Sequence, residues 1–268
     1  MNKGVKISLI IPAYKKIDFL EAVLESINYQ TYRNFEVIVA EDDNTLEEFI
    51  QTIRKKLNYT LFHIQQKDEG YQRNKALNNG VKISSGELIV VVDQDCMLHP
   101  KFLEAYATNY EKADLFTGRR VNLGKKFTEK VLEKRQRKIS LLSLLVSNSS
   151  LKKFPDAIYL PWLNLKRNTR VLGSNFGIRR ELLLKINGFD EDYIGYGLED
   201  VDLDKRCYFV GARRISMKNK AIQYHLYHPE PQGNTGRYEV NRKIFDEMYK
   251  NKRHTCRNGL YKEEKLER

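Results

Sequence analysis

The sequence predicts an α/β fold in which helices cover both faces of a mostly parallel β-sheet. The first hundred residues alternate between short, apolar, β-branched segments and segments whose apolar residues recur every three or four positions. Strands that alternate with helices are typical of parallel sheets, because each crossover connection places a helix on one face. Polar residues directly follow three of the apolar segments. In such sheets ligands bind beyond the carboxyl ends of the strands, so we expect these polar residues to converge on one site.

The pattern also places the elements of this first part in order. Four strands are expected, each a short run of mainly β-branched and other apolar residues: 5–11, 35–40, 61–64 and 88–92. Pro12 is expected to end the first strand, and Asp18 to cap the helix that follows, whose apolar face runs from Phe19 to Ile27. Three further helices complete this part: 46–57, the polar segment 70–80, and one that begins at Pro100, a residue favoured in a first helical turn.

The second half of the chain is more basic. Residues 119–153 contain eleven Lys or Arg and two Glu, so most of the formal net charge of +12 lies there. Such a charge favours an anionic partner, such as a phosphorylated substrate, nucleic acid or an anionic membrane. The alternative is that these basic residues form a solvated helix face without any partner, which would have the same composition. The elements expected in this half are a strand, two helices, one or two further strands and a helical tail: 171–178, 181–186, 199–210, 214–225 and from 241 onward.

Cysteine content and hydropathy limit the expected location. The three cysteines are widely spaced and form no CxxC pair, which is a poor framework for disulfides and favours a reducing compartment. No run of about 18 apolar residues is present, so no transmembrane helix is expected. The apolar run at the N-terminus is too short for a signal peptide. We therefore expect a cytoplasmic protein.

Two carboxylates one residue apart, Asp93 and Asp95, follow the fourth strand directly. On a turn they can present oxygens to a hard cation such as Mg²⁺ or Mn²⁺. A cation there would also hold a diphosphate and offset the charge that develops as the diphosphate leaves. Acids are common in loops after strands, so this motif does not decide the function by itself.

Three later motifs are further candidates. Glu199 and Asp200 follow a segment rich in Gly and Tyr, and a carboxylate there could act as a general base for an acceptor hydroxyl. Acids in a first helical turn also complement the helix dipole, and Asp202 and Asp204 are expected to do only that or to face water. Two histidines, His225 and His228, could complete a metal site. The basic pair Arg73 and Lys75 around Asn74 could contact phosphate or ribose, or simply form a solvated helix face.

Several enzyme classes lack their signatures here. No GxGxxG follows the first strand, which disfavours a dinucleotide-dependent oxidoreductase. The chain has neither a Walker A lysine loop nor the GxSxG elbow of serine hydrolases.

The motifs together resemble the family 2 glycosyltransferases, which have the GT-A fold. Four segments of the first half carry the resemblance: IIPAY (10–14), FEVIVAED (35–42), GYQRNKA (70–76) and SGELIVVVDQD (85–95). Three segments of the second half are similar to the galactosyltransferase-like module of chondroitin-type polymerases and β1,4-galactosyltransferases: GSNFG (173–177), NGFDE (187–191) and GYGLEDVD (195–202). The resemblance covers the chain between residues 5 and 230.

The resemblance implies an inverting, metal-dependent enzyme that moves a hexose or N-acetylhexosamine from a UDP-sugar to a glycan. Asp200 would be the catalytic base, with Glu199 beside it. Asp95 and His225 would ligate Mn²⁺ or Mg²⁺, with His228 as the alternative to His225. The residues expected to bind the donor are Pro12, Ala13, Tyr14, Glu41, Asp42, Arg73, Asn74, Asp93 and Gln94. Those expected to bind the acceptor are Asn175, Tyr196 and Gly197.

The same resemblance gives an expected organisation. Residues 1–118 would form the donor-binding half of one GT-A domain, residues 119–230 its acceptor-binding and catalytic half, and residues 231–268 a basic helical tail. The acceptor would be a glycan or lipid-linked glycan of a bacterial surface polysaccharide. It would be reached from the cytoplasm or from a peripheral position at the inner face of the cell membrane, where the basic stretch would contact anionic lipid. No nucleic acid partner is expected.

Three positions depart from the family pattern. Glu41 stands where Asp is usual, Lys15 replaces a frequent Asn, and Leu198 stands where the galactosyltransferases carry Gly, which leaves the sugar preference open. Two alternative functions were weighed against the transferase. A sugar-nucleotide nucleotidyltransferase needs a Gly-rich, basic N-terminal loop, which residues 11–15 do not supply. A nucleic-acid-binding protein would suit the charge, but no binding motif is present and the basic stretch has few aromatic residues.

Overall fold

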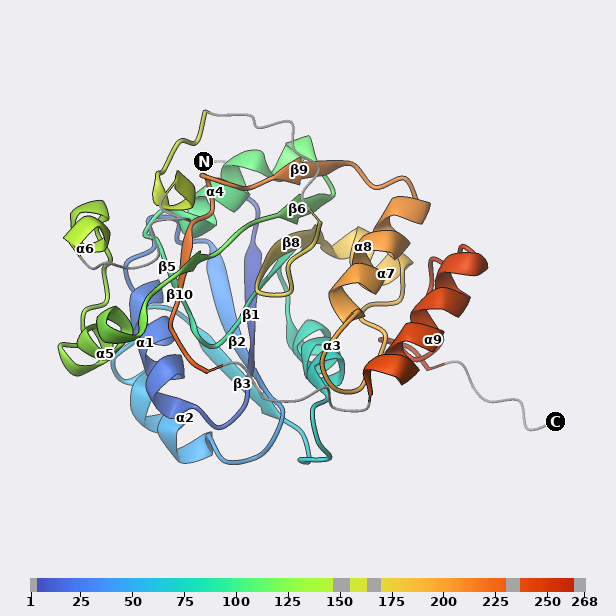
Figure 1. Cartoon of the computed structure of the whole chain (residues 1–268), viewed down its shortest axis with the longest axis horizontal. Coiled ribbons are helices and arrows are strands. Elements are labelled where there is room, and N and C mark those ends of the chain that lie inside the picture. The colour runs from blue at the N-terminus through green and yellow to red at the C-terminus, as the bar shows by residue number, and fades with distance from the viewer. Residues whose placement is uncertain (1–3, 147–154, 163–169, 230–236, 263–268) are drawn as a thin grey trace.

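A seven-stranded sheet forms the centre of the molecule, with helices on both of its faces (Figure 1). The computed structural model describes residues 4–146, 155–162, 170–229 and 237–262. The strands of this sheet are β1 (Ile7–Ala13), β2 (Phe35–Glu41), β3 (Leu61–Gln65), β4 (Leu88–Val92), β6 (Leu115–Thr117), β8 (Asn175–Arg179) and β9 (Arg214–Ser216). Their order across the sheet is β3-β2-β1-β4-β8-β6-β9.

The sheet is mostly parallel, as predicted. β1 pairs in parallel with β2 and β4, and β2 pairs in parallel with β3. β8 runs antiparallel to both of its neighbours, β4 and β6, whereas β6 and β9 are parallel. Because β1, β2 and β4 run in one direction, the residues that follow them lie at the same edge of the sheet.

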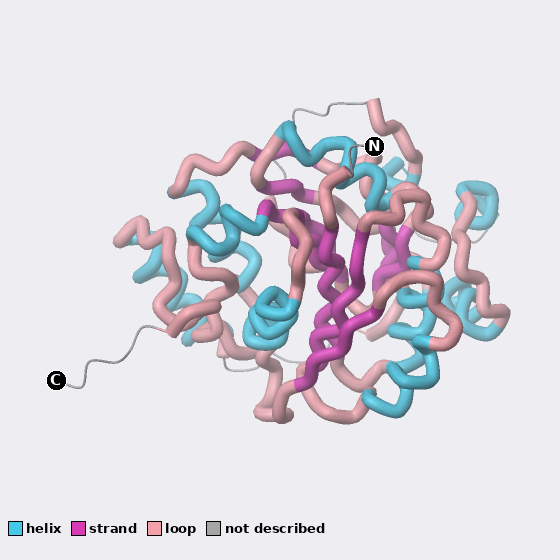
Figure 2. Tube along the Cα trace, turned by 180° about the vertical axis from the view of Figure 1, so that it is seen from behind, coloured by secondary structure: helices cyan, strands magenta, loops and turns pink. Residues whose placement is uncertain are grey.

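Helices cover both faces of the sheet, and Figure 2 shows the same layers from behind. The helices that contribute to the core on the two faces are α1 (Ile17–Ile27), α2 (Glu47–Arg54) and α4 (Phe102–Asn109) on one side and α3 (Arg73–Ile83), α7 (Arg180–Lys185) and α8 (Glu199–Phe209) on the other. Successive strand residues point to opposite faces. Leu9 and Ile11 of β1 therefore pack in the first core, and Ile10 in the second. Burial on both faces explains the continuous apolar runs in the sequence.

A second, three-stranded sheet lies beside the first. It consists of β5 (Cys96–Leu98), β7 (Val121–Asn122) and β10 (Gln223–His225), with β10 in the middle. β10 is antiparallel to β5, and Cys96 pairs with His225. The sequence pattern did not predict β5 or β7, which are only three and two residues long. This pairing brings the segment after β4 beside a segment more than a hundred residues later in the chain.

The remaining helices lie at the edges of the molecule. α5 (Lys125–Glu133) and α6 (Leu141–Val146) occupy one edge, and α9 (Tyr238–Lys250) the opposite edge, in both views (Figures 1 and 2). A short 3₁₀ helix, η1 (Tyr110–Lys112), follows α4. Residues 147–153 of the basic stretch and 231–236 of the expected tail lie outside the described residues. Among the helices that are described, none has both the length and the apolar character that a membrane crossing requires.

Most predicted elements exist, with shifted bounds, and β4 matches its prediction. Pro12 does not end β1. It pairs with Ala40 of β2, beyond the point where the pairing with β4 stops at Ile10, and Pro is tolerated where no partner needs its missing N–H. The predicted cap at Asp18 is also wrong. Lys16 precedes α1 without a side-chain cap, and Asp18 lies in the first turn, where its charge complements the helix dipole.

The predicted polar helix over 70–80 begins at Arg73 and is not polar on its inner face. Asn74 and Asn78 are buried together with apolar residues of the same helix. α3 approaches the sheet closely at Gly80, where a Cβ atom would lie 2.9 Å from Cγ2 of Ile10. This close packing fixes α3, and with it Arg73, relative to the carboxyl ends of β1 and β2.

Candidate active site

Asp95 and two histidines form the densest group of potential metal ligands in the described structure. Asp95 immediately precedes β5 and His225 ends β10, so strand pairing brings them together. Nε2 of His225 lies 3.5 Å from Oδ2 of Asp95, and Nε2 of His228 lies 3.0 Å from the same oxygen. One ligand atom from each residue lies within 4.8 Å of the others. We call Asp95, His225 and His228 the histidine cluster.

The charges within this cluster are strongly coupled. Burial would raise the pKa of Asp95, but hydrogen bonds from His225 and His228 outweigh it and hold that pKa well below its usual value. The hydrogen bond to Asp95 raises the pKa of His228, against a smaller opposing effect of burial. The Cys96 thiol also donates to Oδ1 of Asp95 at 3.3 Å. The cluster therefore offers one ionised carboxylate and two imidazoles, a donor set that suits Mn²⁺ and similar divalent ions.

Arg73 links the residue that follows β4 with a segment of the second half of the chain. Its guanidinium donates to Oδ1 of Asp93 at 2.9 Å and to the Gly173 carbonyl at 2.7 Å. Burial would lower the pKa of Arg73, but the charge of Asp93 and other acidic neighbours, including Glu199, keeps the pKa above its usual value. Arg73 is thus a fixed positive charge between Asp93 and Glu199.

Glu199 and Asp200 lie at the start of α8, after a loop with unusual backbone angles. Gly195, Gly197 and Leu198 all have positive φ, of 78°, 113° and 73°. The Gly197 N–H donates to the Glu199 carboxylate at 2.9 Å. Burial raises the pKa of both Glu199 and Asp200, although the charge of Arg73 acts in the opposite direction. A carboxylate with a raised pKa is a stronger base, as proton abstraction requires.

Side-chain and main-chain contacts hold this loop, which we call the base loop (residues 195–200). The Gly195 N–H donates to the Tyr71 carbonyl at 3.0 Å. From α9, the Asn241 amide donates to the carbonyls of Ile194 and Gly197, at 3.2 and 3.0 Å. Tyr196 is 75% exposed, so its ring is free to contact an acceptor. The base loop is therefore positioned by α9 and by the segment before α3.

The turn after β1 is clamped to the segment after β4. The Gln94 side chain accepts from the Tyr14 N–H at 2.9 Å and donates to the Tyr14 carbonyl at 3.1 Å. The Tyr14 hydroxyl donates to Asp68 at 3.2 Å, and Lys15 donates to both. Pro12 and Ala13 end β1 beside this turn. The oxygen and the nitrogen of the Gln94 amide both bond to the main chain of Tyr14, so these contacts position Tyr14.

The acids after β2 are buried and hydrogen-bonded. Asp42 accepts from Gln66 at 2.6 Å and from the Gln72 N–H at 2.7 Å, and burial raises its pKa. The Glu41 carboxylate accepts from two loop N–H groups and contacts His63 at 2.7 Å. Burial opposes ionisation of Glu41, but these hydrogen bonds lower its pKa to about 2. Both Glu41 oxygens are therefore engaged in shaping the loop that carries Asp42.

Comparison with known proteins identifies the family. The model of glycosyl transferase family 2 matches residues 8–186, which is more than half of the chain. The chain belongs to glycosyl transferase family 2. A second model, described as the N-terminal domain of galactosyltransferase, matches residues 162–229, the part that contains the base loop and the two histidines.

Three similar proteins give the context of this family 2 glycosyltransferase. Chondroitin synthase of Pasteurella multocida is 26% identical over 94% of this chain, but the match spans only 28% of that protein's length. The S. aureus protein TarS 1-349 in complex with UDP-GlcNAc has a TM-score of 0.64 and 20% identity over 90% of this chain and 65% of its own. A Pyrobaculum calidifontis mannosyltransferase in complex with GDP-Man and Mn²⁺ has a TM-score of 0.60 and 16% identity, covering 90% of this chain and 61% of its own. The fold is GT-A.

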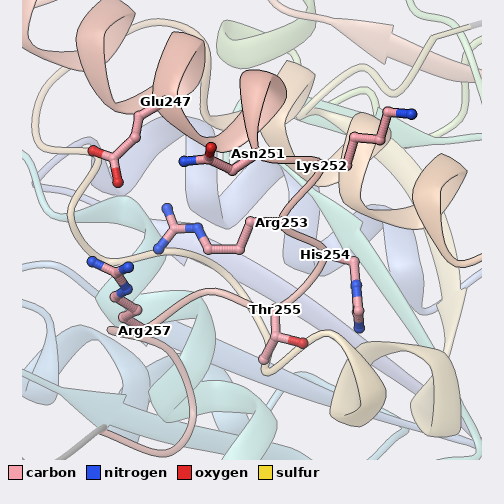
Figure 3. Close-up of a pocket in the computed structure, with 7 residues that line it drawn as sticks. All are labelled: Glu247, Asn251, Lys252, Arg253, His254, Thr255 and Arg257. Atoms are coloured by element: carbon pink, nitrogen blue, oxygen red, sulfur yellow. The ribbon is translucent and has the colours of Figure 1, made fainter.

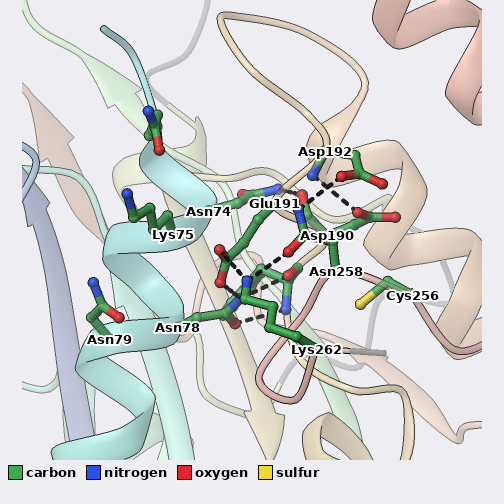
Figure 4. A network of polar contacts seen from close by, with 12 residues as sticks. Asn74, Lys75, Asn78, Asn79, Asp190, Glu191, Asp192, Cys256, Asn258 and Lys262 are labelled. Atoms are coloured by element: carbon green, nitrogen blue, oxygen red, sulfur yellow. Dashed lines mark hydrogen bonds and ion pairs between the residues drawn. The ribbon is translucent and has the colours of Figure 1, made fainter. Parts of the chain in front are cut away.

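Two residues expected to bind substrates have structural contacts in the glycosyltransferase instead. Asn175 is fully buried, accepts from the Tyr106 hydroxyl and donates to two carbonyls, which leaves nothing for an acceptor. Asn74 is also buried, and its amide donates to the Asp190 carbonyl at 2.7 Å (Figure 4). Both predictions are corrected, because the sequence could not show which side of each element faces the core.

The alternative that Asp202 and Asp204 face water is wrong, although Asp202 does lie in the first turn of α8, where its charge complements the helix dipole. Asp202 is buried, lies 2.7 Å from Arg206 and accepts from the Tyr193 hydroxyl. Arg206 in turn donates to the carbonyls of Ile186 and Gly188. Asp204 pairs with Arg214 at 2.9 Å. The hydrogen bonds of Arg206 therefore anchor α8 to residues 186–188, and the pair of Asp204 with Arg214 anchors it to β9.

The sequence does not indicate which residues support the base loop. Asn241 lies in α9, which the sequence predicted as a charged, helical tail without a role in the site. Residues 256–262 return to residues 187–192, where Asn187 donates to the carbonyls of Cys256 and Tyr261. Asn258 donates to Asp192 (Figure 4). No local signal in the sequence indicates such contacts, since they depend on the tertiary arrangement.

A cavity of about 470 Å³ lies elsewhere, at the end of α9 (Figure 3). Basic side chains such as Lys252, Arg253 and Arg257 line it, together with Glu247. None of the residues of the candidate site contributes to its wall. We therefore assign the site from the polar groups at the strand ends and not from this cavity.

Proposed function

We propose that this glycosyltransferase moves a hexose or N-acetylhexosamine from a UDP-sugar to a glycan acceptor, with inversion of the anomeric centre. The observation that carries the proposal is the approach of Asp95, His225 and His228 to within 4.8 Å of one another, with Arg73 bridging from Asp93 toward Glu199. Together these residues would supply a cation site, an arginine on the phosphate side and, next to Glu199, the candidate base Asp200.

The histidine cluster would hold Mn²⁺ or Mg²⁺. Its donor set of one carboxylate and two imidazoles fits Mn²⁺ better than Mg²⁺, which prefers oxygen ligands. When bound, the ion would supply positive charge to the diphosphate of the donor. The Mn²⁺ in the mannosyltransferase with the same fold supports this part of the proposal.

The donor would lie across the carboxyl ends of β1, β2 and β4. Pro12, Ala13, Tyr14 and Asp42 would contact the nucleoside, and Asp93 the ribose or the ion. Arg73 would stay paired with Asp93 and orient it. Gln94 and Glu41 would act indirectly, since their hydrogen bonds hold the Tyr14 turn and the Asp42 loop. The UDP-GlcNAc bound by the structurally similar TarS 1-349 supports a UDP-sugar as donor.

Asp200 would remove the proton from the acceptor hydroxyl. As that oxygen forms its bond to the anomeric carbon, the bond from this carbon to the diphosphate oxygen breaks, and UDP leaves. A single displacement of this kind inverts the anomeric centre. The partly buried position of Asp200 favours it for the role, since desolvation raises the pKa of the carboxyl and so its basicity. Glu199 would hold the Gly197 N–H, and Tyr196 would offer its exposed ring to the acceptor sugar.

The acceptor would be a growing or lipid-linked glycan of a bacterial surface polysaccharide, and the reaction would take place at the cytoplasmic side of the membrane. The similarity to chondroitin synthase supports a polysaccharide product. Because this chain spans only part of that relative, the activity of the whole relative is not carried over.

Calorimetric titration with UDP, with and without Mn²⁺, tests the proposal. We expect binding by the native protein to depend on Mn²⁺, and Asp95→Ala to weaken it at least about tenfold, since even outer-shell partners of metal ligands contribute that much. Asp246→Ala removes an exposed carboxylate on α9 and serves as the control. Absence of UDP binding under both conditions, or metal-independent binding unchanged in Asp95→Ala, would contradict the proposed donor site.

A further inference from the structure

Helix α6 exposes three leucines on the molecular surface. Leu141, Leu142 and Leu145 are 38%, 71% and 52% exposed, whereas Leu144 is buried in the same core cluster as residues of α1 and α5. Leu145 lies three residues after Leu142 and four after Leu141, and these spacings place side chains on one side of a helix. We call the three exposed residues the leucine patch. The helix is thus anchored by one leucine and presents three others outward.

Exposed leucines of this kind call for an explanation. Single exposed apolar residues are normal, but neighbouring ones on a monomer surface mark an interaction site. The leucine patch is not needed to fill the core, because Leu144 already does so. The helix that carries it lies at the edge of the molecule opposite α9 (Figures 1 and 2).

Exposed lysines lie on α5 and on the segment that leads to α6. α5, which lies at the same edge, buries Phe127 and Val131 and exposes its other side. The exposed cations of α5 and of the segment up to α6 are Lys125, Lys126, Lys130, Lys134, Arg135 and Lys138, against the two acids Glu129 and Glu133. None of the five lysines forms an ion pair with any described residue. The edge is therefore both apolar and positively charged.

We propose that the leucine patch and the lysines around it dock on a membrane with anionic lipid headgroups. Leucines of an interfacial helix enter the boundary between headgroups and acyl chains, and lysines beside them contact the lipid phosphates. A protein partner fits less well, because the centres of protein interfaces are depleted of lysine and enriched in aromatic residues and arginine. The combination of leucine with lysine matches the chemistry of a bilayer surface.

Docking at this edge would place the active site near the membrane. The Thr128 hydroxyl of α5 accepts from the Tyr227 N–H at 2.8 Å, next to His228 of the histidine cluster. Docking at α5 would therefore hold the histidine cluster, and with it the proposed donor site, on the side of the molecule that faces the lipid. This last step depends on the proposed function, whereas membrane binding itself does not.

Vesicle flotation with the full chain tests the docking, without any catalysis. The vesicles contain phosphatidylcholine and phosphatidylglycerol in equal parts, with pure phosphatidylcholine as the neutral comparison. We expect the protein to float with the anionic vesicles only. The double variant Leu142→Ser/Leu145→Ser and the double variant Lys130→Glu/Lys134→Glu should each bind at least about tenfold more weakly. Added salt should weaken the binding of the native protein to the vesicles. It should have little further effect on the lysine variant, whose binding is already weak.

Matched controls separate docking from misfolding. Leu184→Ser changes a 41% exposed leucine of α7, and Lys243→Glu/Lys250→Glu changes two exposed lysines of α9. Both should float like the native protein, and circular dichroism and UDP binding should be the same in all variants. The proposal is overturned if the native protein stays in the soluble fraction, or if the leucine variant floats unchanged. It is also overturned if the leucine variant converts a dimer to a monomer in the absence of vesicles, since the patch would then contact a second copy of the chain.

Discussion

The histidine cluster and the base loop are held in different ways. The spacing of Asp95 and His225 is fixed by main-chain pairing between β5 and β10. The base loop belongs to no strand, and the Asn241 side chain, the Tyr71 carbonyl and the Glu199 carboxylate hold it. Substitutions at the first site should therefore act on the bound ion alone, whereas the second site should also respond to residues that never touch substrate.

Asp200→Asn should have the largest effect on turnover. Loss of the base should reduce kcat by about 10²-fold or more, while UDP and Mn²⁺ binding stay near native values. Steady-state transfer assays together with calorimetry measure both quantities. Asp192→Asn changes an exposed carboxyl of the neighbouring segment and serves as the control. Near-native turnover in Asp200→Asn would remove this residue from the role of base.

Asp190→Asn should change how stability depends on pH. Burial raises the pKa of Asp190 from 3.8 to about 6, and its nearest cation, Arg253, lies 3.9 Å away. As the pH rises from 4 to 6, the unfolded chain releases this proton and the folded protein keeps it, so the free energy of unfolding falls. The variant lacks the titrating carboxyl, so the part of this fall that Asp190 causes, about 2 kcal/mol in the free energy of unfolding, should be absent.

Urea denaturation of both proteins at pH 4.5 and at pH 7 tests this prediction. The gain in stability of Asp190→Asn over the native protein should be greater at pH 7. An equal difference at the two pH values would mean that Asp190 is ionised in the folded protein. The result bears on the comparison of the histidine cluster with the base loop, because Asp190 belongs to the segment before the base loop, on the acceptor side of the proposed site.

Asn241→Ala should have a smaller effect that is specific to the base loop. The variant loses both hydrogen bonds to Ile194 and Gly197, so we expect kcat to fall about tenfold, with the affinity for UDP unchanged. Asn251→Ala, at the end of the same helix, is the control. If UDP affinity and kcat fell together, the helix would be supporting the whole domain and the distinction between the two sites would fail.

The parts of the fold that the sequence predicted are those with a strong local pattern. β4 matched because five consecutive apolar residues are buried on both faces. β5 and β7 were missed because strands of two or three residues have no measurable period and exist only through their partners. The bounds of α1 and α3 shifted because Asp18 and Gly70 are only permissive signals, and packing decides where a helix begins.

The candidate site could be predicted in part for the same reason. Asp95, Asp200 and the two histidines stand in recognisable motifs, although only the resemblance joined them across the sequence. Asn74 and Asn175 share those motifs but serve the core, and amide side chains are equally common in both roles. Asn241 stands in no motif, since its contacts arise only when α9 folds back on the base loop.

The pairing of β5 with β10 has a consequence for how such a chain can diverge. Residues 99–222 leave the histidine cluster and return to it, so they form one large loop whose two ends are fixed. The entropy of closing a loop rises slowly, by about 0.6 kcal/mol for each doubling of its length. Insertions in its surface turns would therefore leave Asp95 and His225 together while they reshape the region around the base loop. Proteins that descend from one ancestral chain could in this way keep the proposed donor site and acquire new acceptor specificities.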